Sequence, residues 1–194
     1  MSGSRLRLVA PTRPARDALY AYHTGLDDQP TGYWEQPRFA APLGELRAAS
    51  GGQVAIAFGR GGLLQALDAW QNALLPVSFH ASHDVPVAAR RARGIFAALG
   101  RSPEDFAGRF DGQLSLYERR LVGFAKAMLT EPQLLVLDRL FEDLGHEEQK
   151  GVAGFIELFR RRYPLRRMLY VGLTETVPGF LSEFEPLATM ETVP

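Results

Sequence analysis

A short apolar run that ends in an acidic residue is the feature that most constrains the fold of this chain. Residues Leu134 to Leu137 read LLVL, and Asp138 follows directly. Such a run is typical of a strand buried on both faces of a parallel sheet, and Pro132 ends any helix before it. Ligands bind at the carboxyl ends of strands in open α/β sheets, where an acidic residue commonly holds Mg²⁺ through water or caps a loop. We therefore expect Asp138 at a ligand-binding edge.

The rest of the chain alternates short apolar runs with helical patterns. We expect strands at 5–10, 53–58, 134–138 and 167–173, helices at 14–24, 63–73, 86–107, 115–130 and 146–162, and a short tail. The sequence Ser102-Pro103-Glu104 is typical of a helix start within the 86–107 block. This alternation predicts an α/β fold with a mainly parallel sheet. A chain of 194 residues can bury one substantial core, so we expect one domain over 1–194 with a helical insertion at about 80–130.

Composition narrows the classes of function. The chain has no cysteine, which excludes disulfides and thiolate metal sites, and we interpret His80 and His83 as surface residues, so no metal site is expected. The formal net charge is zero, which gives no reason to expect a nucleic-acid partner. No apolar run reaches about 18 residues and no signal peptide is evident, so we expect a cytoplasmic chain that does not itself span a membrane.

Basic residues gather near the end of the last predicted helix. Arg160, Arg161 and Arg162 are consecutive, and Arg166 and Arg167 follow within a few residues. Two interpretations stay open for this run. It either touches anionic lipid headgroups, or it favours the helix C-terminus electrostatically and is otherwise solvated; the sequence alone favours the second.

The segment before the buried strand carries the first family resemblance. It reads LSLYE, at Leu114, Ser115, Leu116, Tyr117 and Glu118. This segment stands where ABC transporter ATPases carry the signature LSGGQ, and the following RRLVGFAKAML resembles their RQRVALARALL helix. The spacing to the buried strand also resembles the spacing between the signature and Walker B in that family. In this frame Asp138 takes the position of the Walker B aspartate.

Three further segments extend the resemblance. Residues 54–77 resemble the Q-loop segment, residues 168–176 resemble the strand before the H-loop, and residues 10–34 resemble, more weakly, the Walker A region. The resemblance implies a P-loop NTPase-like ABC cassette with a helical insertion and a truncated N-terminal β-subdomain. The subgroup that the sequence most resembles is the Mla/Mce lipid transporter cassettes.

The same comparison implies that the nucleotide-handling residues are replaced. A phosphate loop needs glycines, a lysine and a hydroxyl, and here Arg16 and Asp17 take the places of the lysine and the Ser/Thr. The Q-loop glutamine becomes Gly59 and the H-loop histidine becomes Glu175. Arg139 takes the place of the glutamate that polarises the attacking water.

Few catalytic parts remain in this frame. Leu116 and Tyr117 replace two signature glycines, and Ser115 and Asp138 alone keep their expected identity. Phosphoryl transfer depends on positioned charge and metal, so these replacements imply a pseudo-ATPase. We expect no cofactor, with weak Mg-ATP binding only at a composite site shared with a partner cassette.

The resemblance also implies a docking surface and partners. Five apolar residues at helical spacing are candidates for receiving a permease helix: Leu63, Leu64, Leu67, Trp70 and Leu74. Plain core packing is an equally good interpretation for most of them. The implied partners are an ABC permease and a second, intact cassette, with the chain peripheral on the inner face of the membrane.

Three functions stay open. The first is a catalytically impaired cassette subunit that supports or regulates transport, with lipid as the substrate suggested by the subgroup. The second is an ABC ATPase with residual binding or hydrolysis at a composite site. The third and weakest is a soluble adaptor derived from a cassette.

Overall fold

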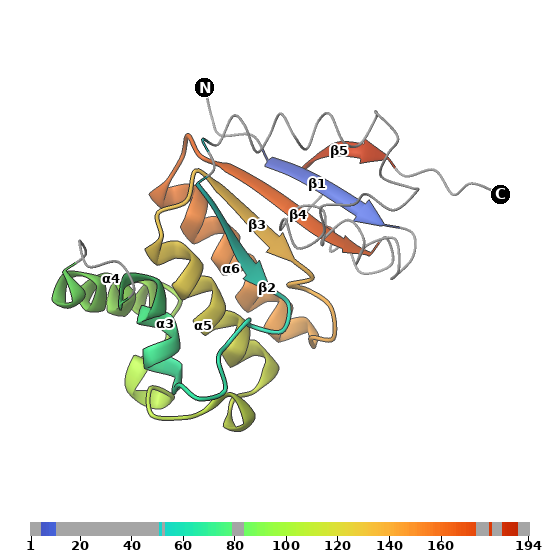
Figure 1. The fold of residues 1–194 in the computed structure, drawn as a ribbon. Helices are drawn as coiled ribbons and strands as arrows, with labels where there is room; N and C mark the ends of the chain where they lie inside the picture. Colours follow the sequence, from blue (N-terminus) through green and yellow to red (C-terminus); the bar gives the residue numbers. More distant parts are fainter. Residues whose placement is uncertain are drawn as a thin grey trace.

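The computed structural model describes residues 5–10, 51, 53–78, 84–173, 179 and 184–189. The strands are β1 Arg5–Ala10, β2 Val54–Phe58, β3 Leu134–Asp138, β4 Arg167–Leu173 and β5 Glu185–Thr189. The α-helices are α3 Ala69–Ser78, α4 Val85–Ala98, α5 Leu116–Leu129 and α6 His146–Arg162, with short 3-10 helices at η1 Pro103–Asp105 and η2 Asp111–Gln113. Within the described residues the strands form one sheet in the order β2-β3-β4-β1-β5, with every pairing parallel (Figure 1).

Strand β3 lies inside the sheet, as its apolar run predicts. All five of its residues are buried, and it pairs with β2 on one side and β4 on the other. Phe58 and Val171 stand opposite Asp138 in the two registers. The prediction of a buried strand at 134–138 is therefore confirmed, and Asp138 lies at the carboxyl edge of the sheet.

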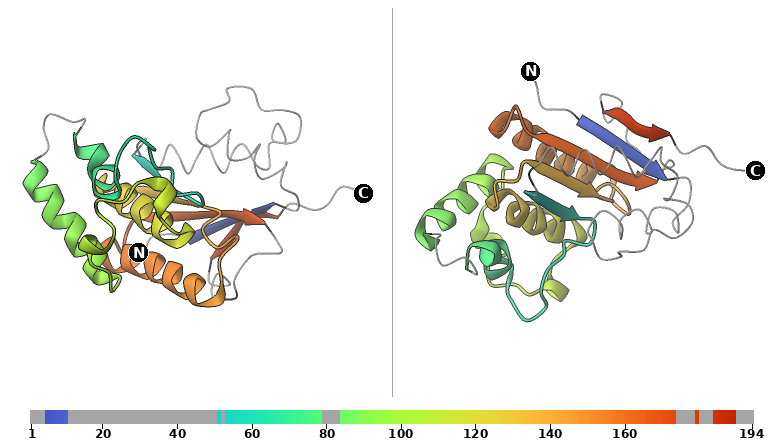
Figure 2. Two further views of the ribbon diagram at one scale, coloured as in Figure 1. Left: turned by 90° about the horizontal axis from the view of Figure 1, so that it is seen from below. Right: turned by 45° about the horizontal axis from the view of Figure 1, so that its top comes forward.

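Helix α5 is the centre of the helical layer. Figure 2 shows α6 along one face of the sheet and α5 between α6 and α3. The Phe124 ring stacks on Phe155 of α6 with centroids 4.7 Å apart, and Tyr117 also contacts Phe155 at 5.9 Å. These aromatic contacts join the two helices over the buried core. Among the described helices, none combines the length and the hydropathy needed to cross a membrane.

The predicted helix at 63–73 is wrong in its position, because α3 begins only at Ala69. Gly61 and Gly62, with φ angles of 84° and 61°, stand just before the predicted start, and residues 63–68 form irregular and turn backbone before the helix. Asp68 and Gln71 then form a capping box: the Gln71 N–H donates to Asp68 Oδ1 at 2.8 Å and the Asp68 N–H donates to Gln71 Oε1 at 3.0 Å. This reciprocal cap sets the start of α3.

The predicted helical block at 86–107 is also too long. Helix α4 ends at Ala98, and Gly100 follows with a φ of 68°. The start expected at Ser102 yields only the single 3-10 turn η1, because the Ser102 hydroxyl bonds the Glu104 carboxylate instead of capping the backbone. The next residues extend toward α3, where the Trp70 N–H donates to the Ala107 carbonyl at 3.1 Å.

Strand β5 was not predicted, since only a tail was expected after residue 173. It pairs in parallel with β1 and carries Pro186. Proline is tolerated in edge strands but weakens the sequence pattern of a strand, which explains the omission. Strand β1 and helix α6 lie at the predicted bounds, whereas the helix predicted at 14–24 falls outside the described residues.

Candidate functional site

An ion pair between neighbours occupies the carboxyl edge of β3. Asp138 is 0% exposed, and Arg139 Nε lies 3.0 Å from its Oδ2 and 3.1 Å from its Oδ1. The Arg139 backbone has a φ of 55°, and its N–H donates to the Val171 carbonyl at 2.9 Å. The residue that follows the buried aspartate thus turns back and places a guanidinium against both carboxylate oxygens. This arrangement neutralises the charge of Asp138.

Gly59 packs closely against the backbone of this ion pair. It is buried, and a Cβ at this position would lie 2.8 Å from both the Cβ and the carbonyl oxygen of Arg139. It would also lie 2.9 Å from the Asp138 carbonyl oxygen. Two of these three atoms belong to the backbone and cannot move aside as the end of a flexible side chain does. A glutamine side chain therefore has no room at this position in the present structure.

Arg120 of α5 joins the two loops at this edge of the sheet, the one after β2 and the one after β3. Its side chain is buried, with the residue 2% exposed, and it donates to the carbonyls of Gly59 at 2.6 Å, Leu140 at 2.9 Å and Glu142 at 2.6 Å. Burial lowers the pKa of the Arg120 guanidinium, and the nearby carboxylate of Asp143 opposes that shift. The guanidinium remains charged and satisfies three carbonyls from two separate loops.

Two more residues on the same stripe of α5 fasten the loop after β2. A Cβ on Gly123 would lie 2.2 Å from the Gly61 carbonyl oxygen, so the loop backbone rests on the helix backbone. Lys126 Nζ donates to the Gly62 carbonyl at 2.7 Å, and burial lowers its pKa. Positions 120, 123 and 126 are spaced along one face of α5. We call the loop of residues 59–62 held by this face the clamped loop.

The predicted signature residues Ser115 and Glu118 form the N-terminal cap of α5. The Glu118 N–H donates to Ser115 Oγ at 3.2 Å, and the Ser115 N–H donates to Glu118 Oε2 at 2.7 Å. Arg109 donates to the same carboxylate through its two terminal nitrogens: Nη1 to Oε1 at 2.8 Å and Nη2 to Oε2 at 2.9 Å. Burial raises the pKa of Glu118, but the hydrogen bonds from Arg109 and Ser115 and the Arg109 charge outweigh it, so the pKa lies below its ordinary value of 4.5.

Replacing Glu118 with glutamine is expected to lower the free energy of unfolding at pH 7 by about 1 to 2 kcal/mol. Because the folded pKa of Glu118 is depressed, its contribution is present above the unfolded value and is lost as pH falls through the folded value. Urea titrations from pH 7 to pH 3 should therefore show a shallower loss of stability for E118Q than for the native chain.

The matched control for this prediction is Glu147→Gln. The Glu147 side chain is 83% exposed and pairs with Lys150 within one helical turn. Such surface pairs contribute little, so this change should cost less than about 0.5 kcal/mol. Equal pH slopes for E118Q and the native chain would contradict the role of Glu118.

The other signature-like residues serve the core. Leu114 is buried, Leu116 is partly buried, and the Tyr117 side chain points into the α5–α6 interface. A Cβ on Gly151 would meet the Tyr117 ring and hydroxyl at 2.7 Å, so glycine makes space for this ring. Tyr117, which the resemblance aligns with a signature glycine, therefore packs between α5 and α6.

The five candidate docking residues do not share one helical face. Leu74 belongs to the buried core, Leu63 and Trp70 pack against it, Leu67 is partly buried, and Leu64 is 50% exposed. The first three along the chain lie before the helix begins. Of this group only Leu64 offers a large exposed apolar side chain.

A buried amide explains the shape of the loop before α3. Asn72 is 0% exposed, and its Nδ2 donates to the carbonyls of Leu64, Leu67 and Asp68 at 3.0, 2.9 and 3.1 Å. The Leu64 N–H donates back to its Oδ1 at 2.8 Å. Asn72 was not among the residues predicted to have a role. An isolated asparagine within an apolar segment is the signal that would have indicated it.

The structure brings Gly59, Asp138 and Arg139 together at one edge of the sheet. Ser115 and Glu118 belong to the separate cap cluster at the start of α5. The predicted replacement positions Arg16, Asp17 and Glu175 lie outside the described residues. Arg120, Gly123 and Lys126 were not predicted as site residues, because only the folded chain brings them to the clamped loop.

The fold is that of an ABC-type ATP-binding cassette. The chain resembles the ATP-binding cassette MJ0796 in a dimeric post-hydrolysis state bound to ADP and Pi, with 15% identity, a TM-score of 0.64, and coverage of 90% of this chain and 76% of that chain. Another structure of MJ0796, described as a bacterial ABC transporter cassette, is 16% identical with a TM-score of 0.64. The match covers 88% of this chain and 75% of that chain. The cbiO1 protein from Clostridium perfringens is 15% identical with a TM-score of 0.60, and the match covers 91% of this chain and 70% of that chain. No protein-family model and no curated protein matches the sequence.

Proposed function

We propose that this chain is a catalytically impaired cassette subunit that docks on a membrane permease and supports or regulates transport. The observation that carries the proposal is the Arg139–Asp138 ion pair at the carboxyl edge of β3. In an active cassette this edge holds a carboxylate that faces metal and a second acid beside it. In this chain Arg139 stands at the position of the second acid, and its guanidinium pairs with the carboxylate of Asp138.

The chemistry of Mg-nucleotide does not fit these residues. Mg²⁺ needs accessible carboxylate oxygens, directly or through water, and Arg139 Nε lies within 3.1 Å of both oxygens of Asp138. A divalent cation placed there would face a fixed guanidinium at close range, where like charges repel strongly. Gly59 leaves no side chain to bind the metal from the neighbouring loop. These observations support a cassette that does not hydrolyse ATP by itself.

The permease partner is proposed from the fold and from one relative. The cbiO1 protein is described as part of the ABC transporter complex cbiONQ. We infer that the present chain also assembles with a permease, together with a second, intact cassette that supplies the ATPase activity. The exposed Leu64 before α3 is the candidate contact. We place the chain on the cytoplasmic face of the membrane, with lipid as the proposed cargo class.

A residual ATPase at a composite site is the second candidate function. The exposed Ser115 at the start of α5 favours it, because its hydroxyl keeps a proton to donate while its oxygen caps the helix. A partner cassette with an intact phosphate loop would bring the nucleotide to this serine. The partner's residues, and not Asp138, would then hold the metal.

Purification of the tagged chain from its native membranes in mild detergent, followed by mass spectrometry of stoichiometric partners, tests the proposal. We expect a permease together with a second cassette that has intact nucleotide residues. Recovery of a permease with no other ATPase would contradict catalytic impairment, since the transporter would then lack any other motor. Recovery of a lone soluble protein would favour the adaptor interpretation.

A further inference from the structure

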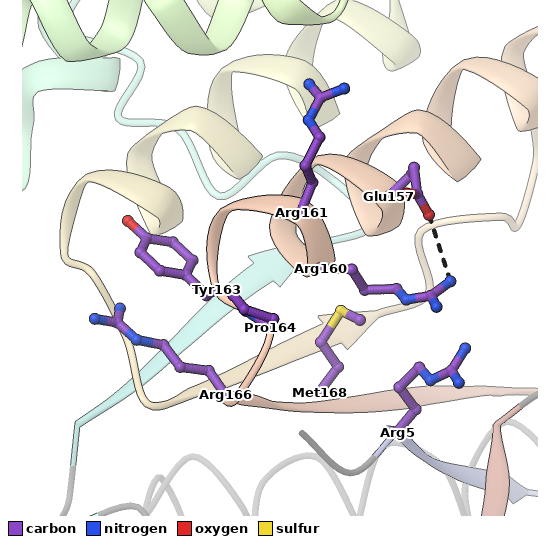
Figure 3. A pocket seen from close by; sticks show the side chains of 8 residues that line it. All are labelled: Arg5, Glu157, Arg160, Arg161, Tyr163, Pro164, Arg166 and Met168. Carbon is purple, nitrogen blue, oxygen red and sulfur yellow. Dashed lines mark hydrogen bonds and ion pairs between the residues drawn. The ribbon is translucent and has the colours of Figure 1, made fainter. Parts of the chain in front are cut away.

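A basic hollow lies at the opposite edge of the sheet from Asp138. Its volume is about 250 Å³, and it lies between the start of β1, the last turn of α6 and the start of β4 (Figure 3). The lining includes four arginines and one carboxylate: Arg5, Arg160, Arg161, Arg166 and Glu157. Buried Met168 also lines the hollow and stands directly opposite Arg5 in the β1–β4 register. The hollow is therefore built by three elements that the fold brings together.

The charge of this lining favours an anion. Four guanidinium groups and one carboxylate give a local formal charge of +3, whereas the whole chain has a formal net charge of zero. Arg160 Nη1 lies 3.4 Å from Glu157 Oε2, and both side chains are well exposed, so this pair offsets little of the field. All the cations are arginines, whose planar donor fork matches the oxygens of a phosphate.

Stacking on an aromatic ring holds the side chain of Arg166 in place at one end of the hollow. The Arg166 guanidinium lies 4.0 Å above the centroid of the Tyr163 ring, and its Nη1 donates to the Pro132 carbonyl at 3.2 Å. Arg162 approaches the same ring at 5.9 Å, and Phe159 packs against its edge at 5.3 Å. These contacts reduce the side-chain entropy that Arg166 would lose on binding an anion.

An exposed apolar residue beside the hollow indicates the source of the anion. Leu165 is 71% exposed and lies in the turn between α6 and β4, with Arg166 after it and the last turn of α6 before it. It is the most exposed of the large hydrophobic side chains in the described part of the chain. An exposed apolar side chain next to an arginine-lined hollow suits the boundary between headgroups and acyl chains of an anionic bilayer. A small soluble phosphate would gain nothing from Leu165.

We propose that the hollow and Leu165 form a contact site for anionic phospholipid, with the headgroup phosphate among the arginines and Leu165 at the acyl boundary. This site goes beyond the proposed subunit function, because it is a direct lipid contact independent of any permease. It lies at the amino ends of β1 and β4, whereas Asp138 lies at the carboxyl end of β3. Loss of one site therefore leaves the other intact.

Vesicle co-sedimentation of the purified full chain tests this site. We expect the chain to partition onto phosphatidylcholine vesicles that contain one third phosphatidylglycerol and not onto pure phosphatidylcholine vesicles. Arg161→Glu should lower the partition coefficient at least about tenfold, since it replaces a cation of the hollow with an anion. Arg60→Glu is the matched control: Arg60 is exposed beyond the carboxyl end of β2, and its reversal should change partitioning less than about twofold.

Two further variants keep the test independent of the fold of R161E. Leu165→Ser should lower partitioning by about tenfold through lost apolar burial, and Glu157→Gln should raise it about fivefold by removing the carboxylate of the hollow. Equal binding to neutral vesicles would overturn the proposal, as would equal losses for R161E and R60E. Saturable binding of free glycerol phosphate without vesicle binding would also overturn it, in favour of a soluble anion.

Discussion

Replacing Arg120 with methionine is expected to lower the free energy of unfolding by about 3 kcal/mol. The native guanidinium satisfies the carbonyls of Gly59, Leu140 and Glu142, whereas methionine keeps only an unbranched apolar stem and donates nothing. Three carbonyls from two loops would then lose their partner in a buried place. Urea denaturation followed by circular dichroism measures the change.

Arg91→Met is the control for this prediction. Arg91 pairs with Glu131 at the surface, where both side chains are more than two fifths exposed, so its loss should cost less than about 1 kcal/mol. A loss below about 1 kcal/mol for R120M as well would show that Arg120 does not hold the two loops together.

The second large effect is expected from Gly123→Ala, which should lower the free energy of unfolding by about 2 to 3 kcal/mol. Alanine is the better helix former by about 1 kcal/mol, but here its Cβ would lie 2.2 Å from the Gly61 carbonyl oxygen. Because the Gly61 carbonyl belongs to the backbone, the steric overlap can be relieved only if the clamped loop moves away from α5. The steric cost therefore exceeds the gain in helix propensity.

The same substitution at Gly94 should have the opposite sign. Gly94 lies inside α4, and a Cβ there would meet nothing within 4 Å. Gly94→Ala should therefore raise the free energy of unfolding by about 0.5 to 1 kcal/mol. Thermal and urea unfolding of the two variants give a paired comparison. Stabilisation by both would show that the clamped loop does not rest on Gly123.

Elements with a strong local pattern were predictable from the sequence, and those shaped by distant contacts were not. The run before Asp138 and the amphipathic pattern of α6 gave the bounds of β3 and α6 directly. The start of α3 depends on the Asp68 cap and on the buried amide of Asn72, which bonds carbonyls four to eight residues away. Hydrophobic spacing alone does not report such polar contacts.

The candidate site shows the same division. The family resemblance aligned Arg139 with the glutamate that follows the Walker B aspartate, but the adjacency of two residues in the chain does not predict whether their side chains meet. The left-handed backbone of Arg139 turns its guanidinium back onto Asp138, and this follows from the folded loop. The contact between Gly61 and Gly123 likewise joins residues 62 positions apart, beyond the reach of any local pattern.

The most direct test of the central claim is phosphate release from Mg-ATP by the purified chain, measured with and without Mg²⁺ and compared with Asp138→Asn. Because Arg139 neutralises the carboxylate that would face the metal, we predict no Mg-dependent release above background and no difference between the two proteins. Mg-dependent turnover by the native chain that disappears in D138N would contradict the account and would make this chain an ATPase in its own right.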